Sequence, residues 1–277
     1  MRLSLIHADL HTHSDYSDGS IPPPELLLRA GYAGLAAIAL TDHDTVDGVE
    51  PMRGAAPEGA PEVIAGLELS CMDGDDEIHI LGHWVDPDYP PLRTELARIR
   101  GMRVRRAESI LDRLRAHRIV LDLEDVMGLT RNGLVGRPHI AEAIVRRGLV
   151  PDLETVYRKY LGDGRPAAVP KRSLSPADGV RLIRRAGGIA SVAHPGVGAI
   201  RNLLPPLAAS GLAGLEVWHP KHSSRDVERF TALAEQLGLV PTGGSDYHGL
   251  DSGATILGHY GLTEDRFERY RAAAGRG

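Results

Sequence analysis

Short apolar runs in this sequence repeatedly end in a histidine or a carboxylate, and this regular placement limits the folds that the chain can adopt. Polar residues of this kind follow or close the runs at Asp9, His11, His13, Asp42, His43, Asp44, Glu68, His79, His194, Asp246 and His248. A parallel β/α barrel builds its active site from polar residues at its strand ends, which all lie on one rim. The pattern therefore favours a barrel with a polar site on one rim.

Seven stretches have the apolar character of strands, and helical stretches fall between most of them. The predicted strands are residues 3–8, 36–40, 62–67, 77–85, 188–193, 214–217 and 239–242. Among the helices, one is predicted over 25–33 after three prolines and one over 176–186, with Ser175 as N-cap and Pro176 at the first helical position. Strands that alternate with helices predict a parallel sheet covered on both faces. No Gly-rich dinucleotide fingerprint follows the first strand, so a closed or nearly closed barrel is favoured over an open doubly wound sheet.

The strand–helix alternation stops between about residues 92 and 167. This stretch holds a long Arg-rich segment, a short acidic helix near 123–127 and further helices near 138–147 and 153–161. Helix-rich sequence that interrupts an alternating pattern predicts an inserted subdomain, and residues 162–166 are typical of an exit linker. We expect residues 1–91 and 168–277 to form the barrel and residues 92–167 to form an inserted helical subdomain.

Length, composition and charge narrow the class of protein. At 277 residues and 42% hydrophobic residues, the chain can form one large α/β domain or a domain with an insertion. A net charge of −5 argues against a protein that coats nucleic acid or binds duplex DNA stably, but it allows a nucleotide in one basic pocket. The single cysteine, Cys71, excludes an internal disulfide and a Cys-rich zinc site. With no signal sequence and no apolar run of membrane-spanning length, a cytoplasmic enzyme is expected.

The paired histidines give the first indication of a metal site. His11 and His13 are two residues apart at a strand end, so both imidazoles point to the same face and can reach one ion. Taken alone, they could be surface histidines, just as Asp18 in Ser-Asp-Gly could be part of an ordinary turn. Similarly, Glu68 could be an exposed strand-end glutamate.

Two further motifs have alternatives of their own. Either Asp42 or Asp44 could be a helix N-cap, although that role leaves His43 unexplained. One of His79 and His83 could be a core or surface histidine.

Taken together, nine histidines and carboxylates at successive strand ends indicate a site for two or three transition-metal ions with mixed ligands. The nine are His11, His13, Asp18, His43, Glu68, His79, His194, Asp246 and His248.

These motifs together resemble the polymerase and histidinol phosphatase (PHP) family of metallophosphoesterases. The resemblance lies in Asp9-Leu-His-Thr-His-Ser-Asp-Tyr-Ser-Asp-Gly19, Thr41-Asp-His-Asp44, Glu68, His79, Ala193-His-Pro195 and Gly244-Ser-Asp-Tyr-His248. It implies a distorted seven-stranded β/α barrel. The chain is most similar to the subgroup with a helical insertion, whose members remove the 3′-phosphate from nucleoside 3′,5′-bisphosphates or trim short RNA from the 5′ end.

The resemblance also implies three metal sites, of which the first two share Glu68. The sites would comprise, in turn, His11, His13, Glu68 and Asp246; Glu68, His79 and His194; and Asp18, His43 and His248. Other branches of the family have a histidine where Asp18 stands, so occupancy of the third site stays open. The family uses manganese, iron or zinc, and the ligand set does not choose among them.

Such a site has a known chemistry. Two cations can share a water, lower its pKa towards neutrality and present hydroxide in line with a phosphorus atom. Catalysis would then depend on the ligands His11, His13, Glu68, His194 and Asp246. The leaving alkoxide needs a proton or a metal contact, which the third ion or a histidine such as His222 could supply. His222 is equally well explained as an exposed loop residue.

Phosphate recognition needs fixed positive groups besides the metals. Arg137-Pro-His139 opens a predicted helix of the insertion, where backbone N–H groups already favour an anion. In the resembling subgroup this Arg-x-His contacts substrate, although an arginine at a helix start and a histidine capped by its neighbours is the alternative. Lys171, one of only three lysines, is a second candidate. The Arg-rich run 98–118 could guide a longer nucleic acid, but a solvated helix face is the favoured interpretation.

Two classes of function follow. The first is a metal-dependent phosphatase or 5′→3′ exonuclease acting on nucleotides, with the insertion as a substrate lid. Its substrate could instead be another small phosphomonoester, such as histidinol phosphate or a biosynthetic intermediate. The second class is a non-catalytic barrel that keeps metal for structure or binding. That class fits poorly, because all nine ligand positions hold competent residue types.

Overall fold

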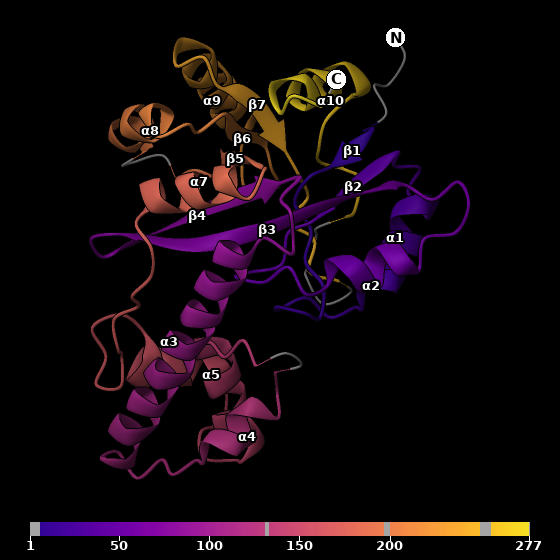
Figure 1. Ribbon diagram of the computed structural model, residues 1–277. Helices are drawn as coiled ribbons and strands as arrows, with labels where there is room; N and C mark the ends of the chain where they lie inside the picture. Colours follow the sequence, from indigo (N-terminus) through magenta and orange to yellow (C-terminus); the bar gives the residue numbers. More distant parts are fainter. Residues whose placement is uncertain (1–5, 131–132, 197–199, 250–255, 277) are drawn as a thin grey trace. The chain divides into compact units, whose positions relative to one another are not determined.

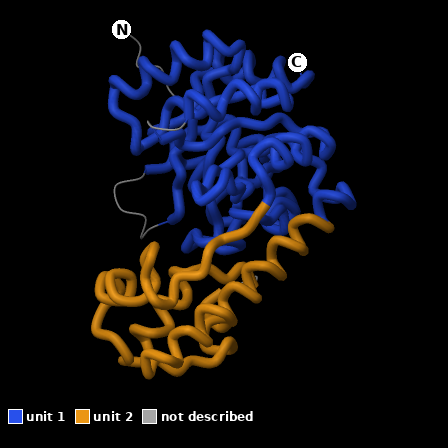
Figure 2. Tube along the Cα trace, turned by 90° about the vertical axis from the view of Figure 1, so that its left-hand side faces the viewer, with its two compact units in different colours: residues 1–93, 174–277 blue, residues 94–173 orange. Residues whose placement is uncertain are grey.

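The computed structural model describes residues 6–130, 133–196, 200–249 and 256–276, and the chain divides into two compact units. Unit 1 comprises residues 1–93 and 174–277, and unit 2 comprises residues 94–173, as coloured in Figure 2. Within the described residues, no helix is both long enough and apolar enough to span a lipid bilayer.

Unit 1 contains one seven-stranded sheet in which the strands neighbour each other in chain order (Figure 1). The strands are β1 (Ala8–Asp9), β2 (Ala37–Leu40), β3 (Glu62–Asp73), β4 (Asp76–His83), β5 (Ile189–Val192), β6 (Gly214–Trp218) and β7 (Val240–Gly243). All seven correspond to strands predicted from the sequence. Residues 3–5 of the first predicted strand lie outside the described residues.

The prediction of a fully parallel sheet is wrong at β4. This strand runs antiparallel to β3 and to β5, whereas the other neighbouring pairs are parallel. The reason is that β3 continues well past residue 67 and turns at Gly74, with a φ of +62°, directly into β4. Two strands joined by so short a turn must be antiparallel, since a parallel pair needs a long crossover. A hairpin therefore replaces one β/α unit of the expected barrel.

This hairpin also changes where two site residues lie within their strands. Glu68 is inside β3 and not at its end, and His79 lies in the first half of β4, paired with Ser70. Since β4 runs in the opposite direction, its beginning reaches the same rim as the carboxyl ends of the parallel strands. A parallel bridge between His43 and Glu68 marks the level of that rim.

Backbone hydrogen bonds beyond β1 and β7 bring the two edges of the sheet together. The N–H of His13 donates to the carbonyl of Tyr247 at 2.9 Å, and the N–H of Asp246 donates to the carbonyl of His11 at 2.8 Å. The sheet is therefore a nearly closed seven-stranded barrel. The same bonds place residues 11–13 and 246–248, which carry four predicted metal ligands, side by side.

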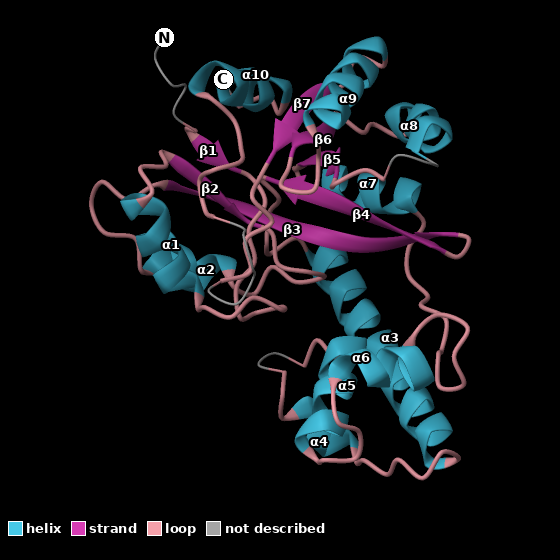
Figure 3. Cartoon of the chain, turned by 180° about the vertical axis from the view of Figure 1, so that it is seen from behind, coloured by secondary structure: helices cyan, strands magenta, loops and turns pink. Residues whose placement is uncertain are grey.

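Helices cover the outside of this sheet (Figure 3). They are α1 (Pro23–Tyr32), α2 (Val49–Gly54), α7 (Pro176–Arg185), α8 (Ile200–Ala209), α9 (Ser224–Gln236) and α10 (Glu264–Ala273). α1 packs on β2, α7 on β3 to β5, α9 on β6 and β7, and α10 on β7. α7 begins as predicted, because the Ser175 hydroxyl accepts a bond from the Asp178 N–H at 3.1 Å and Pro176 follows it.

His83 is the core histidine that the sequence left as one alternative. It is fully buried, one ring nitrogen contacts the Tyr270 hydroxyl at 2.9 Å, and the other donates to the carbonyl of Leu10 at 2.8 Å. Burial lowers the pKa of His83 to about 4, so this imidazole is neutral. Tyr270 and Phe267, both of α10, pack in one apolar core cluster with Leu10.

Unit 2 consists of helices around an apolar core. These helices are α3 (Pro90–Arg115), which begins in unit 1, α4 (Leu123–Met127), α5 (Arg137–Arg146), α6 (Leu153–Val156) and a π-helical turn over Tyr157–Leu161. Its buried side chains include Ile110, Leu114, Ile140, Ile144 and Leu161. Unit 2 therefore has an apolar core of its own.

The exit from unit 2 lies later than residue 167, where the sequence analysis placed it. Arg106 Nε of α3 donates to the carbonyl of Val169 at 2.8 Å, and Val169 also packs against the apolar core of unit 2. These contacts hold residues 168–173 in unit 2, so Lys171 belongs to the helical unit and not to the barrel.

Candidate metal centre

Histidines and carboxylates from the barrel segments meet at one rim of unit 1. Their nitrogen and oxygen atoms form four groups whose members lie within 4.8 Å of one another. The groups are His13, Asp18, His43 and His248; His11, His219 and Asp246; His11, Glu68 and His194; and His43, Glu68 and His79. All nine predicted ligands therefore lie in one connected cluster, together with His219, which the sequence analysis did not select.

Glu68 lies at the centre of this cluster and is fully buried. Its oxygens lie between 2.7 and 3.2 Å from the ring nitrogens of His11, His13, His43, His79 and His194. Burial opposes ionisation of Glu68, but the surrounding imidazoles outweigh it and hold its pKa well below the ordinary range. Glu68 is thus a charged carboxylate that links two sides of the cluster, as a bridging ligand requires.

Two more carboxylates face the cluster from different loops. Asp246 Oδ1 lies 3.3 Å from His13 Nε2 and 3.5 Å from His11 Nε2. Asp18 lies 3.3 Å from His248 and 3.7 Å from His43. Burial would raise the pKa of both carboxyl groups, yet the neighbouring imidazoles lower it more strongly, so both are ionised. The Ser-Asp-Gly turn does bring Asp18 back to the rim.

The backbone at two of these positions is strained. His194 has a φ of +23° and Asp246 a φ of +52°, values that residues with a side chain rarely adopt. Such conformations cost about 1–3 kcal/mol each and persist where surrounding bonds enforce them, frequently at functional sites. Hydrogen bonds from the N–H of His194 to Glu216 and from the N–H of Asp246 to the carbonyl of His11 do so here.

Further buried carboxylates support the loops that carry the cluster. Asp9 accepts the N–H groups of Ser245 and Gly258, at 2.9 and 3.2 Å. Asp42 accepts both the N–H and the hydroxyl of Ser14, at 2.8 and 2.6 Å. Asp44 accepts the N–H of Ser70 at 2.8 Å.

Neither Asp42 nor Asp44 is the N-cap of α2, which is Gly48. Their carboxylates hold backbone and hydroxyl groups, which leaves His43 to face the cluster.

The sequence analysis did not identify two residues near the cluster, Glu216 in β6 and His219 in the loop after it. Glu216 is fully buried and contacts His11, and His219 is buried with Nε2 3.3 Å from Asp246 Oδ2. The signal was present, since residues 214–217 form an apolar run that is followed by a histidine. His219 thus stands after its strand in the same way as the other polar residues of the rim.

The segment His219-Pro-Lys-His222 places its two histidines differently. His219 Nδ1 accepts the N–H of Lys221 at 3.2 Å, and Lys221 Nζ lies 3.2 Å from Asp246 Oδ2. In contrast, His222 Nδ1 donates to the carbonyl of Val217 at 2.9 Å, and its ring lies against Phe230. His219 therefore faces Asp246, whereas the sequence nominated His222.

The unsatisfied nitrogens of the cluster fit a bound cation. Among the described residues, both ring nitrogens of His13 and the Nδ1 atoms of His43 and His79 are buried without a hydrogen bond. Burial lowers the pKa values of all three imidazoles; nearby carboxylates nevertheless raise those of His13 and His79 to about 10 and 9, while His43 falls to about 4. Buried imidazoles and carboxylates gathered at one place are a suitable donor set for manganese, iron or zinc.

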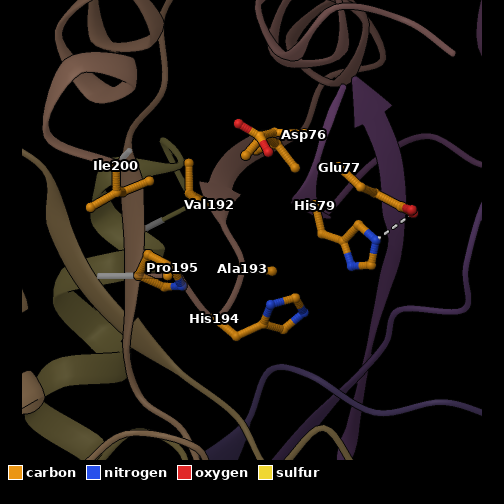
Figure 4. A pocket seen from close by; sticks show the side chains of 10 residues that line it. Asp76, Glu77, His79, Val192, Ala193, His194, Pro195 and Ile200 are labelled. Atoms are coloured by element: carbon orange, nitrogen blue, oxygen red, sulfur yellow. Dashed lines mark hydrogen bonds and ion pairs between the residues drawn. The ribbon is translucent and has the colours of Figure 1, made fainter. Parts of the chain in front are cut away.

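A cavity of about 380 Å³ opens beside His79 and His194 (Figure 4). It is lined by Asp76, Glu77, Ile78, His79, Val192, Ala193, His194, Pro195, Gly196 and Ile200. Glu77 contacts His79 Nε2 at 2.9 Å, which leaves His79 Nδ1 for Glu68. The cavity offers space for a small ligand next to the histidine cluster.

The predicted phosphate contacts Arg137, His139 and Lys171 all belong to unit 2. Arg137 Nη1 lies 2.7 Å from Asp163 Oδ1, and His139 Nδ1 accepts the N–H of Gly136 at 3.1 Å, which caps α5. His139 thus satisfies a backbone N–H at the start of its own helix through Nδ1. Arg137 lies in a recess of α3 and α5 together with Arg103 and Arg106, so positive charge gathers at the start of α5.

Comparison with known proteins agrees with this geometry. The PHP domain model matches residues 9–142. A 3′,5′-nucleoside bisphosphate phosphatase from Chromobacterium violaceum is 36% identical over 94% of this chain and 93% of its own length. The 5′-3′ exoribonuclease Rnm from Escherichia coli is 32% identical over 87% of this chain and 84% of its own length.

A solved structure gives the same result. The crystal structure of a putative metal-dependent phosphoesterase from Bifidobacterium adolescentis aligns with a TM-score of 0.85 and 29% identity, over 97% of this chain and 96% of that one. The likeness covers both units of the chain. With the family match and the full-length relatives, it identifies this chain as a member of the PHP domain family and as a metal-dependent phosphoesterase.

Proposed function

We propose that this chain hydrolyses the 3′-phosphate of a nucleoside 3′,5′-bisphosphate. The observation that carries the proposal is the buried histidine–carboxylate cluster with unsatisfied nitrogens, which is suited to metal-dependent phosphoester hydrolysis. The choice of substrate is supported by 36% identity, over nearly the whole chain, to a 3′,5′-nucleoside bisphosphate phosphatase.

In this proposal three sets of residues hold two or three divalent ions, which are manganese, iron or zinc. The sets are His11, His13, Glu68 and Asp246; Glu68, His79 and His194; and Asp18, His43 and His248. The short contacts of Glu68 to five imidazoles support its role as the shared ligand. Ions held there would polarise the phosphoryl oxygens and lower the pKa of a water molecule towards neutrality.

The residues around the ligands would control protons and orientation. His219 holds a proton at Nε2, because its Nδ1 accepts the N–H of Lys221, and this proton points to Asp246. His219 would therefore orient the Asp246 carboxylate, whereas His222 is bonded to the carbonyl of Val217. No serine or cysteine is needed as a nucleophile, since Cys71 is buried in β3.

Recognition of the second phosphate is the role we propose for unit 2, acting as a substrate lid. Arg137 and Lys171 would supply its positive groups and His139 a hydrogen-bond donor at Nε2, and a guanidinium suits a phosphate because it offers paired donors. Lys221 adds a cation from unit 1, and its contact with Asp246 supports a place beside the reacting phosphate. We assign the uncharged nucleoside to the cavity beside His79 and His194, where carboxylates would disfavour a second phosphate.

Trimming of short RNA from the 5′ end is the second candidate function. It is supported by the 32% identity to an exoribonuclease and requires the same phosphoester chemistry. A different small phosphomonoester, such as histidinol phosphate, is the remaining alternative for the same centre.

The test is release of inorganic phosphate by the manganese-loaded protein from adenosine 3′,5′-bisphosphate, with 5′-AMP, histidinol phosphate and a short 5′-phosphorylated RNA measured in parallel. We expect the bisphosphate to have the highest kcat/KM and to yield 5′-AMP. Preferred turnover of histidinol phosphate, or of RNA without bisphosphate turnover, would contradict the assignment. The Asp246→Asn variant serves as the control for contaminating phosphatase.

A further inference from the structure

We propose that Glu216 is a positioning residue of the metal centre, which fixes the ring of His11 and the backbone of His194 in the orientation that metal binding requires. The inference rests on the proposed ligand set, because His11 and His194 belong to it. Glu216 itself is not among the proposed ligands.

The geometry of Glu216 is that of a clamp between two loops. It lies in β6, is fully buried, and uses both carboxylate oxygens. Oε1 lies 3.0 Å from His11 Nδ1, and Oε2 accepts the N–H of His194 at 2.6 Å. His11 follows β1 and His194 follows β5, so one side chain connects segments 183 residues apart (194 − 11).

The bond to His11 selects one form of the imidazole. An ionised carboxylate can only accept, so His11 Nδ1 must carry the proton that lies between it and Glu216. The lone pair of a neutral ring is then on Nε2, which faces Glu68 at 3.1 Å and Asp246 at 3.5 Å. Metal-binding histidines commonly donate their other nitrogen to a carboxylate in this way, which fixes the ring and raises its basicity.

The bond to His194 acts on the backbone instead. With a φ of +23°, His194 has a conformation that it would leave if nothing held it. Glu216 accepts its N–H at a short distance, and the same residue presents Nε2 to Glu68 at 3.0 Å. Loss of this bond would let the backbone relax and would carry the imidazole away from Glu68.

The ionisation of Glu216 is consistent with this role. Both of its oxygens face donors, His11 Nδ1–H and the N–H of His194, as the oxygens of a carboxylate require. A buried carboxylate that stays ionised can accept two bonds at once, whereas an amide of the same shape cannot.

The Glu216→Gln variant uses this difference. A glutamine has one acceptor and one donor group, but both of its partners, His11 Nδ1–H and the His194 N–H, are donors, so one bond must be lost. Thr242→Val is the matched control, since Thr242 is buried on the neighbouring strand β7 and contacts Ser191 at 2.9 Å. The control also loses a buried hydrogen bond of the barrel, but one that does not involve the cluster.

We would measure Mn²⁺ and Zn²⁺ affinity by chelator competition, together with the tautomer of the histidine rings by long-range ¹H–¹⁵N NMR of the zinc-loaded protein. We expect about tenfold to hundredfold weaker metal binding for Glu216→Gln, as is typical of such outer partners, and a changed signal for one ring. Thr242→Val should bind metal like the wild type. Excess metal should restore much of the phosphatase activity of Glu216→Gln.

Unchanged metal affinity and ring signals in Glu216→Gln would overturn the proposal, and so would equal losses in both variants. If Glu216→Gln does not fold, Glu216→Asp is the variant to measure, because it keeps the carboxylate but has a shorter side chain. Weaker metal binding by Glu216→Asp would support the proposal, and wild-type metal binding would overturn it. Metal affinity and the ring signals are measured without a substrate. Failure of the bisphosphate assay would therefore affect only the proposed function, whereas a wild type that binds no divalent ion would overturn both.

Discussion

The two units of this chain differ in whether their polar side chains are buried or exposed. In the described part of the chain, every fully buried polar or charged residue lies in unit 1, and the buried side chains of unit 2 are apolar. The charges of unit 2 form exposed pairs such as Arg98 with Glu95 and Arg115 with Asp112. Burying charge is costly unless it is paired, whereas exposed pairs contribute little to stability. The free-energy cost of burying charged groups therefore falls on unit 1. Unit 2 is an ordinary helical core with a charged surface.

The comparison also separates what a substitution should do in each unit. In unit 1, removing one member of the cluster leaves its partners buried and unpaired, so metal binding and activity change together. In unit 2, a surface arginine can be removed with little structural effect, so any functional effect reports contact with substrate.

The largest effect is expected from Asp246→Asn. Loss of one proposed ligand charge should lower kcat/KM by a factor of about 10³ or more, because metal ions contribute several kcal/mol to transition-state stabilisation. Metal content per chain, measured by plasma mass spectrometry, should fall in the same variant. The control is Asp226→Asn in the capping box of α9, which is not a member of the cluster and should retain wild-type turnover. Near-normal activity of Asp246→Asn would show that unit 1 does not carry the chemistry.

The next effect is the pH dependence of metal binding. His13 and His79, with pKa values near 10 and 9, hold protons at neutral pH in the metal-free protein. Their ion pairs stabilise that form fully below the unfolded value of about 6.5, and this contribution is lost as pH rises through 9 to 10. Metal must displace these protons, so its affinity should rise about tenfold per pH unit for each proton displaced.

Two measurements check this expectation. Chelator competition between pH 6 and 8 gives the slope of metal affinity, and a pH indicator in weak buffer reports protons released on metal addition. The difference in Tm between the metal-loaded and the metal-free protein should also become larger as pH rises. A metal affinity independent of pH would mean that these histidines are neutral or are not ligands.

A smaller effect is expected from Arg137→Gln in unit 2. A charged hydrogen bond contributes about 1.5–3 kcal/mol, so loss of a phosphate contact should raise KM for the bisphosphate by roughly tenfold to hundredfold. Metal affinity should not change. Asp163→Asn is the matched variant, because it breaks the ion pair of Arg137 but keeps the guanidinium. If both variants lower the Tm equally and leave KM unchanged, Arg137 has only a structural role.

The smallest effect should come from the apolar core of unit 2. Ile144 is fully buried there, and Ile144→Val removes one methylene, which typically costs 0.5–1.5 kcal/mol of unfolding free energy. Denaturant unfolding followed by circular dichroism would measure the change. Metal affinity should stay at the wild-type value, since the ligands belong to unit 1. A parallel loss of metal affinity would mean that the two units do not behave as separate cores.

Much of the barrel could be predicted from the sequence because the residues that indicate each strand are adjacent in the chain. An apolar run followed by a histidine or carboxylate identifies a strand and its end from adjacent residues, and so the strands and the polar rim were predicted. The same rule would have found His219. It could not have ranked His219 above His222, because that depends on a backbone N–H from Lys221 and on the carbonyl of Val217.

Other features depend on contacts between distant segments. The sequence suggested a parallel sheet, but the direction of β4 follows from how far β3 extends before Gly74, which no local pattern encodes. Similarly, Lys171 belongs to unit 2 because an arginine of α3 holds the backbone at Val169.

The sequence by itself determined the type of chemistry, because a metal site needs particular residue types and these are visible wherever they stand. Which side chains share an ion, and which ones hold the ligands in place, was decided only by the tertiary structure. Glu216 illustrates the reason: its role arises from two hydrogen bonds to residues 205 and 22 positions away, and burial gives these bonds their strength.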